Sequence, residues 1–74
     1  MDITNLVRMA NRIGDFFEAM ADRDEAVEGV AQHLDKFWEP RMRRLLQKHV
    51  AQGDADDLHP LVALAVRRRA DALQ

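Results

Sequence analysis

The stretch that decides how this chain folds is FWEPRMRR, residues 37–44. Pro40 stands in its middle, and a proline has no backbone N–H to donate and clashes with the carbonyl four residues before it. It also disfavours helical backbone geometry at the preceding residue, Glu39. We therefore expect a helix to kink or stop near Trp38 and to restart with Pro40 in its first turn.

The same stretch has the composition of a docking surface. Phe37 and Trp38 supply large apolar rings that lose little rotamer freedom on binding, and arginines follow that add planar hydrogen bonding. The two rings are neighbours, about 100° apart around a helix. We therefore expect one ring to face the core and the other to face outward, with Trp38 as the outward anchor. The alternative, in which both rings belong to the chain's own core, stays open.

We predict a partner interface made of this stretch and one aromatic residue from the first helix. Its arginines would recognise carboxylates of a partner, or a phosphate-bearing cofactor that the partner holds. The alternative is that they lie on a solvated helix face. The predicted interface residues are Phe16, Phe37, Trp38, Glu39, Pro40, Arg41, Met42, Arg43 and Arg44.

Hydrophobic spacing predicts helices on both sides of the break, at about 3–20, 23–38 continuing as 40–51, and 60–73. Asp22 with Glu25 has the spacing of a capping box and marks the start of the second helix. Gly53 is a suitable terminator of the restarted helix, and Pro60 suits the first position of the last one. In the first helix, one face carries Ile3, Leu6, Val7, Ala10, Ile13, Gly14, Phe17 and Met20.

These elements predict an all-α fold, a small three-helix domain that spans residues 1–74. Two long antiparallel helices, the second broken or kinked near Pro40, carry a C-terminal helix that packs on them or on a partner. Gly14 lies within the apolar face of the first helix, where a missing side chain would let another helix approach closely.

Composition argues against an enzyme that acts alone. The chain has 74 residues and no cysteine, so it forms no disulfide and holds no metal through thiolates. The chain has no serine and no tyrosine, so Thr4 carries its only side-chain hydroxyl. This leaves little for covalent catalysis. We predict no catalytic, cofactor-binding or metal-ligating residue. The three histidines, which lack paired helical spacing, are expected to be structural or surface residues: His33, His49 and His59.

Charge and hydropathy narrow the choice of partners. The formal net charge is -2, which does not suggest a nucleic-acid binder. The signs are segregated, because acidic residues dominate 15–35 and basic residues dominate 36–48. This pattern suits electrostatic complementarity with a protein, although solvated helix faces would look the same. No apolar run reaches membrane-spanning length and no signal peptide is visible, so we expect a cytoplasmic protein that binds no membrane.

Four segments together resemble the delta subunit of soluble NAD-dependent formate dehydrogenase. They are LVRMANRIGDFF at 6–17, AQHL at 31–34, FWEPRMR at 37–43 and LHPLV at 58–62. The chain departs from the family pattern at His59, where a serine often stands.

The resemblance implies a subunit of a bacterial cytoplasmic complex that oxidises formate to carbon dioxide with NAD. Its alpha subunit carries a molybdenum or tungsten bis-molybdopterin guanine dinucleotide cofactor and iron–sulfur clusters, and other subunits carry FMN and further clusters. The delta subunit is implied to be non-catalytic and to support assembly or stability of the active complex.

Residues and resemblance together lead to a hypothesis of function. The chain is an accessory subunit that binds the formate dehydrogenase alpha subunit and supports its assembly, cofactor retention or stability. Two alternatives stay open: a transient maturation chaperone for the cofactor-bearing subunit, and a self-associating helical interaction module.

Overall fold

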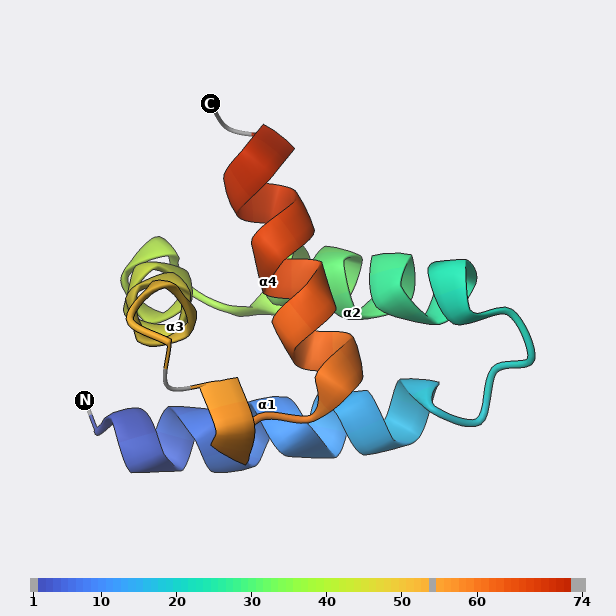
Figure 1. Cartoon of the computed structure of the whole chain (residues 1–74), viewed down its shortest axis with the longest axis horizontal. Helices are drawn as coiled ribbons and strands as arrows, with labels where there is room; N and C mark the ends of the chain where they lie inside the picture. The colour runs from blue at the N-terminus through green and yellow to red at the C-terminus, as the bar shows by residue number, and fades with distance from the viewer. Residues whose placement is uncertain (1, 54, 73–74) are drawn as a thin grey trace.

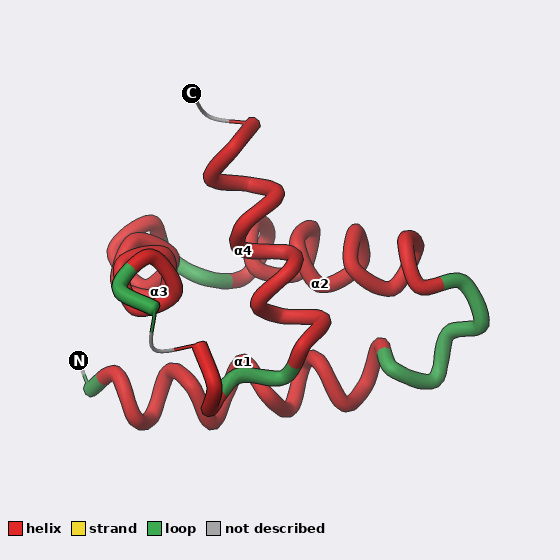
Figure 2. Tube along the Cα trace, in the orientation of Figure 1, coloured by secondary structure: helices red, strands yellow, loops and turns green. Residues whose placement is uncertain are grey.

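The computed structural model describes residues 2–53 and 55–72, and throughout these residues its regular structure is helical (Figures 1 and 2). This confirms the prediction of an all-α fold. The predicted last helix extended to Leu73, which lies outside the described residues. The elements are α1 (Ile3–Phe17), α2 (Arg23–Phe37), α3 (Pro40–Ala51), the short 3-10 helix η1 (Ala55–Asp57) and α4 (Pro60–Ala72).

Acidic side chains cap the first two helices. The backbone N–H of Thr4 donates to Asp2 Oδ1 at 3.0 Å at the start of α1. At the start of α2, the N–H groups of Asp24 and Glu25 donate to Asp22 Oδ1 at 2.9 and 3.3 Å. The start of α2 was predicted from this capping chemistry, which satisfies donors that have no partner within the helix.

The first helix is shorter than predicted. It was expected to reach residue 20, but α1 ends at Phe17. The N–H of Met20 bonds to the carbonyl of Phe17 at 3.1 Å in a tight turn. The chain must reverse within a few residues, because Asp22 already caps the antiparallel α2. A hydrophobic pattern that continues to Met20 does not reveal this reversal.

Pro40 breaks the helix rather than kinking it. Trp38 and Glu39 have extended backbone, and Pro40 opens α3 at its first position. Figure 1 shows α1 and α2 side by side and antiparallel, whereas α3 is seen nearly end-on. The chain therefore turns sharply at residues 38–39, and α3 runs across one end of the α1–α2 pair.

The last helix, α4, crosses the α1–α2 pair and completes the core (Figure 1). It packs against α1, α2 and α3, most extensively against α2. Its own residues Leu61, Val62, Ala63, Ala65 and Val66 are all buried, so α4 packs on its own chain, one of the two possibilities left open by the sequence. No helix in the described part of the chain is long and apolar enough to cross a membrane.

The connection from α3 to α4 is fixed to α1 by one side chain. Gly53 ends α3 with a positive φ of 84°, a conformation that glycine adopts without strain. Asn11 Nδ2 then donates to the carbonyl of Asp57 at 2.9 Å, and Asn11 Oδ1 accepts the N–H of His59 at 2.8 Å. His49 Nε2 lies 3.0 Å from Asp57 Oδ1. These contacts hold the connection against α1 and α3.

Gly14 allows this connection to approach α1 closely. A Cβ atom at Gly14 would lie 2.6 Å from Cγ and 2.8 Å from Cβ of His59. A close approach at Gly14 is therefore observed, but the approaching group is the side chain just before α4 and not a helix, as was predicted.

Candidate functional site

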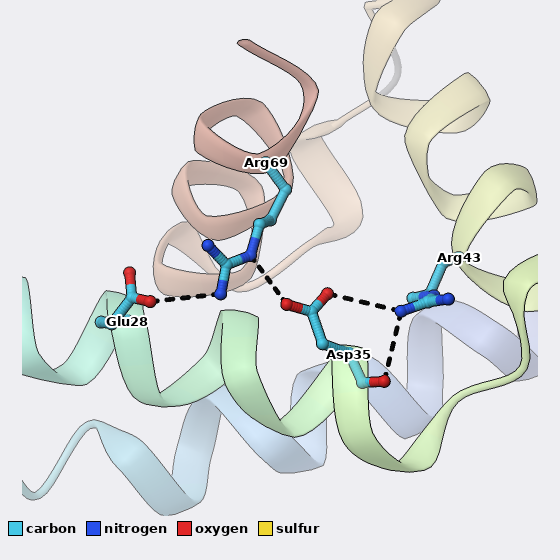
Figure 3. Close-up of polar contacts among 4 residues, drawn as sticks. All are labelled: Glu28, Asp35, Arg43 and Arg69. Atoms are coloured by element: carbon cyan, nitrogen blue, oxygen red, sulfur yellow. Dashed lines mark hydrogen bonds and ion pairs between the residues drawn. The ribbon is translucent and has the colours of Figure 1, made fainter. Parts of the chain in front are cut away.

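One side of α2 is joined to α3 and α4 by an ion-pair network (Figure 3). Arg69 of α4 donates through Nη2 to Glu28 Oε1 at 3.1 Å. Its Nε lies 2.9 Å from Asp35 Oδ2, an ionic contact whose alignment does not make a hydrogen bond. Arg43 of α3 reaches the same Asp35 through Nη1, at 3.2 Å from its carbonyl and 3.5 Å from Oδ1. The charges on this side are matched within the chain.

The other side of α2 carries a row of aromatic rings that continues onto α1. We call the four residues Phe16, Phe17, His33 and Phe37 the aromatic row. Phe16 and Phe17 meet edge to face with centroids 5.1 Å apart, and the Phe17 and His33 centroids lie 6.3 Å apart. His33 and Phe37 follow at 4.8 Å. The row thus connects two residues that are far apart in the sequence, Phe16 and Phe37.

The two end residues of the row are open to solvent. Phe16 is 75% exposed and Phe37 is 69% exposed, whereas Phe17 and His33 between them are half-buried. Rings this exposed leave a large apolar area in water, which a partner surface could remove. The row is therefore the candidate functional site of this chain, and its chemistry is that of binding.

Gly29 is the residue of α2 against which the Phe17 ring of the aromatic row packs. A Cβ atom at this position would lie 2.6 Å from Cε1 and 2.7 Å from Cδ1 of Phe17. Because glycine has no side chain, the Phe17 ring lies directly against the α2 backbone. This contact brings the row together across the two helices.

The aromatic row and the ion-pair network lie on different sides of α2. Asp35 is two residues from His33 and two from Phe37, which places it about 200° around the helix from each. Since Asp35 and Glu28 face Arg69 of α4, the row lies on the side of the α1–α2 pair away from α4.

The prediction that Trp38 is the outward ring is wrong. Trp38 is 6% exposed and belongs to the hydrophobic core, and Phe37 is the exposed one. Trp38 continues the buried series Val27, Ala31, Leu34 with steps of four, three and four. Phe37 lies four residues after His33, on the side of α2 that carries the aromatic row. One ring faces inward and one outward as expected, but their roles are reversed.

The other predicted interface residues are divided between surface and interior. Glu39, Pro40, Arg41 and Arg44 are exposed. Met42 is half-buried and packs against the core, and Arg43 is bound to Asp35. The structure therefore joins Phe16 to Phe37 and leaves Arg41 and Arg44 accessible nearby in the chain.

Sequence reasoning missed the two middle members of the row. Phe17 was assigned to the apolar face of α1, and His33 was expected to be a structural or surface residue with no part in an interface. The spacing of Gly29, His33 and Phe37, four residues each, was the available signal, because such residues lie on one side of a helix. That signal becomes meaningful only when α1 is known to lie beside α2.

A second cluster lies at the start of α4. Ligand atoms of Asp15, Glu18 and His59 lie within 4.8 Å of one another, and His59 Nε2 is 3.4 Å from Glu18 Oε1. His59 Nδ1 accepts the N–H of Leu61 at 3.1 Å, so in the neutral ring the proton sits on Nε2 and faces the carboxylates. We interpret the cluster as a polar contact between the imidazole and the two carboxylates that positions His59.

The family model described as "NADH-dependant formate dehydrogenase delta subunit FdsD" matches residues 5–66 of the chain. Nothing matched in the comparisons with curated proteins and with solved structures.

Proposed function

The chain belongs to the family of NADH-dependent formate dehydrogenase delta subunits, and from this premise we propose that it binds the catalytic alpha subunit and keeps the complex assembled and active. It takes no part in catalysis itself. The observation that carries the proposal is the family match, which spans both the aromatic row and the Pro40 stretch.

The surface of the chain supports a binding role. Its buried face is already complete, with α4 and Trp38 filling the core. Phe16 and Phe37 remain exposed on the opposite side of the α1–α2 pair. Aromatic residues of this kind are enriched among the anchors of protein interfaces, because they bury much area at low entropic cost.

The mechanism that we propose is thermodynamic linkage. A protein that binds the folded partner and not its unfolded form stabilises the folded form. The alpha subunit would thereby hold its molybdenum or tungsten pterin cofactor more firmly. We assign this cofactor, the iron–sulfur clusters, FMN and NAD to other subunits of a cytoplasmic complex, since this chain offers no cysteine to ligate a cluster.

Two alternatives lead to different observations. A transient maturation chaperone would bind the alpha subunit before the cofactor is loaded and would be missing from the finished enzyme. A self-associating module would form a stable dimer when isolated. A permanent subunit is favoured because the family is described as a subunit.

The test is to purify the formate dehydrogenase complex from a strain that lacks this chain. Molybdenum or tungsten content and NAD-linked formate oxidation are then measured beside the wild-type complex. Low metal with low activity is expected if the chain supports cofactor retention, and full metal with unstable activity if its support is structural. Normal metal content and normal, lasting activity would contradict the proposal.

A further inference from the structure

Exposed apolar side chains gather on one part of the molecule. Among the described side chains, the large apolar ones with the greatest exposure all lie on α1, α2 or the connection between them: Met9, Phe16, Met20 and Phe37. Met9 lies seven residues before Phe16, on the same side of α1. The apolar surface is therefore a continuation of the aromatic row along α1.

Cations are close in the sequence to Phe37, at one end of this surface. Lys36 precedes Phe37 directly, Arg41 follows it by four residues and Arg44 by seven, and all three are exposed. We call these three residues the basic flank. Within residues 2–53 and 55–69, whose side chains the structure describes, none of the three takes part in an ion pair, whereas Arg43 beside them is paired with Asp35.

Acidic residues gather at the other end of the α1–α2 pair. Asp15 and Glu18 at the end of α1, and Asp22, Asp24 and Glu25 at the start of α2, are all exposed. Figure 1 shows this connection at the end of the molecule opposite α3. The charge is thus segregated along the longest dimension, and the apolar surface lies between the two ends.

Resting on the proposed function, we infer that the aromatic row docks into an apolar groove of another formate dehydrogenase subunit, and that this groove is bordered by carboxylates that meet the basic flank. Two observations support this occupant. The exposed rings offer apolar area that a partner can bury, and the cations of the basic flank have no ion-pair partner among the described side chains.

The two parts of the surface have different tasks in this inference. Burial of Phe16 and Phe37 supplies the binding free energy and slows dissociation, because central aromatic residues dominate such interfaces. Lys36, Arg41 and Arg44 lie at the rim, where charges orient the approaching partner and mainly change the association rate. Salt should weaken this second contribution, since exposed charges are screened over about 8 Å at physiological ionic strength.

The experiment compares three variants in the intact complex. Phe16→Ala/Phe37→Ala removes the ends of the row, and Lys36→Glu/Arg41→Glu/Arg44→Glu reverses the basic flank. Arg67→Glu reverses one exposed cation of α4 and is the control for a single charge reversal away from this surface. Each complex is purified through a tag on the catalytic subunit. The loss of this chain after dilution and its rate of rebinding to complex that lacks it are then followed at low and high salt. Circular dichroism of each purified chain checks that the helices remain.

The aromatic variant is expected to dissociate at least about tenfold faster at either salt concentration, in line with the loss of two interface anchors. The flank variant should associate more slowly than wild type at low salt, with a difference that shrinks at high salt. The control should behave as wild type.

Three outcomes would overturn this inference. Folded aromatic and flank variants that are retained like wild type would overturn it alone, because the proposed function would still stand. A wild-type chain that is missing from the purified complex would overturn the proposed function as well. If the isolated wild-type chain were a dimer by light scattering and Phe16→Ala/Phe37→Ala a monomer, the occupant would be a second copy instead.

Discussion

The two sides of α2 differ in whether their charged side chains are paired within the chain. On the side that faces α4, Arg69 and Arg43 share Asp35, and Glu28 takes the remaining contact of Arg69. On the side away from α4, the rings of Phe16 and Phe37 are exposed, and the cations close to Phe37 in the sequence have no ion-pair partner among the described side chains. The first side is completed by the chain's own fold. The second is arranged as a surface to be completed from outside.

The same contrast appears between two adjacent residues. Trp38 is buried beneath the helices and Phe37 is exposed beside them, although both are large rings in the same stretch. The comparison shows that composition alone does not separate a folding residue from a binding residue. Their difference depends on which neighbouring element occupies each side of α2.

The largest expected effect is a difference in stability between alanine variants of Trp38 and Phe37. Trp38→Ala should lower the free energy of unfolding by about 3–5 kcal/mol, because it removes a buried ring and leaves a cavity. Phe37→Ala should change it by less than about 1 kcal/mol, as exposed substitutions usually do. Urea unfolding of the purified chain, followed by circular dichroism, measures both. Equal losses would show that Phe37 also belongs to the core.

Much of the backbone could be predicted from local rules. Pro40 ends one helix and opens the next because of its own ring, and Asp22 starts α2 because its carboxylate lies close to the N–H groups of Asp24 and Glu25. Gly53 ends α3 through a positive φ. Each of these depends on atoms within a few residues, so the sequence contains the needed information.

The binding surface could be predicted only in part. The predicted interface included Phe16 and Phe37, although with Trp38 as the outward ring. The connection of Phe16 to Phe37 through Phe17 and His33 depends on how α1 lies beside α2. The choice between Phe37 and Trp38 depends on where the core lies after the chain turns. The pairing of Arg43 with Asp35 also requires the turn at Pro40. These are tertiary facts, and helical periodicity does not contain them.

The next largest effect compares two glycines of the α1–α2 pair. Gly14 on α1 contacts His59 just before α4, and Gly29 on α2 contacts Phe17 of the aromatic row. Gly14→Ala should destabilise the chain by roughly 1–3 kcal/mol, because the new methyl group meets the His59 side chain. His59 is held in place by two hydrogen bonds: its backbone N–H donates to Asn11 Oδ1, and its Nδ1 accepts the N–H of Leu61. Gly29→Ala meets the Phe17 ring. That ring lies at an open surface and can swing outward, while alanine gains about 1 kcal/mol in helix propensity.

We therefore expect Gly29→Ala to change the free energy of unfolding by less than Gly14→Ala does. Thermal unfolding of the two variants beside wild type measures the difference. A larger loss for Gly29→Ala would mean that the aromatic row is rigid and contributes to the stability of the free chain.

The smallest expected effect concerns the ion pairs of Arg69, on the side of α2 that faces α4. Arg69→Met should cost about 1 kcal/mol at low salt, since exposed and half-exposed ion pairs contribute little, and the buried Nε of Arg69 has no aligned hydrogen bond to lose. The loss should shrink in 1 M salt because the contacts with Glu28 and Asp35 are screened. Arg67→Met, on the exposed side of the same helix, should change nothing measurable. If Arg69→Met were neutral at low salt as well, charge matching on this side would position the helices without stabilising them, and the two sides of α2 would then differ in geometry rather than in energy.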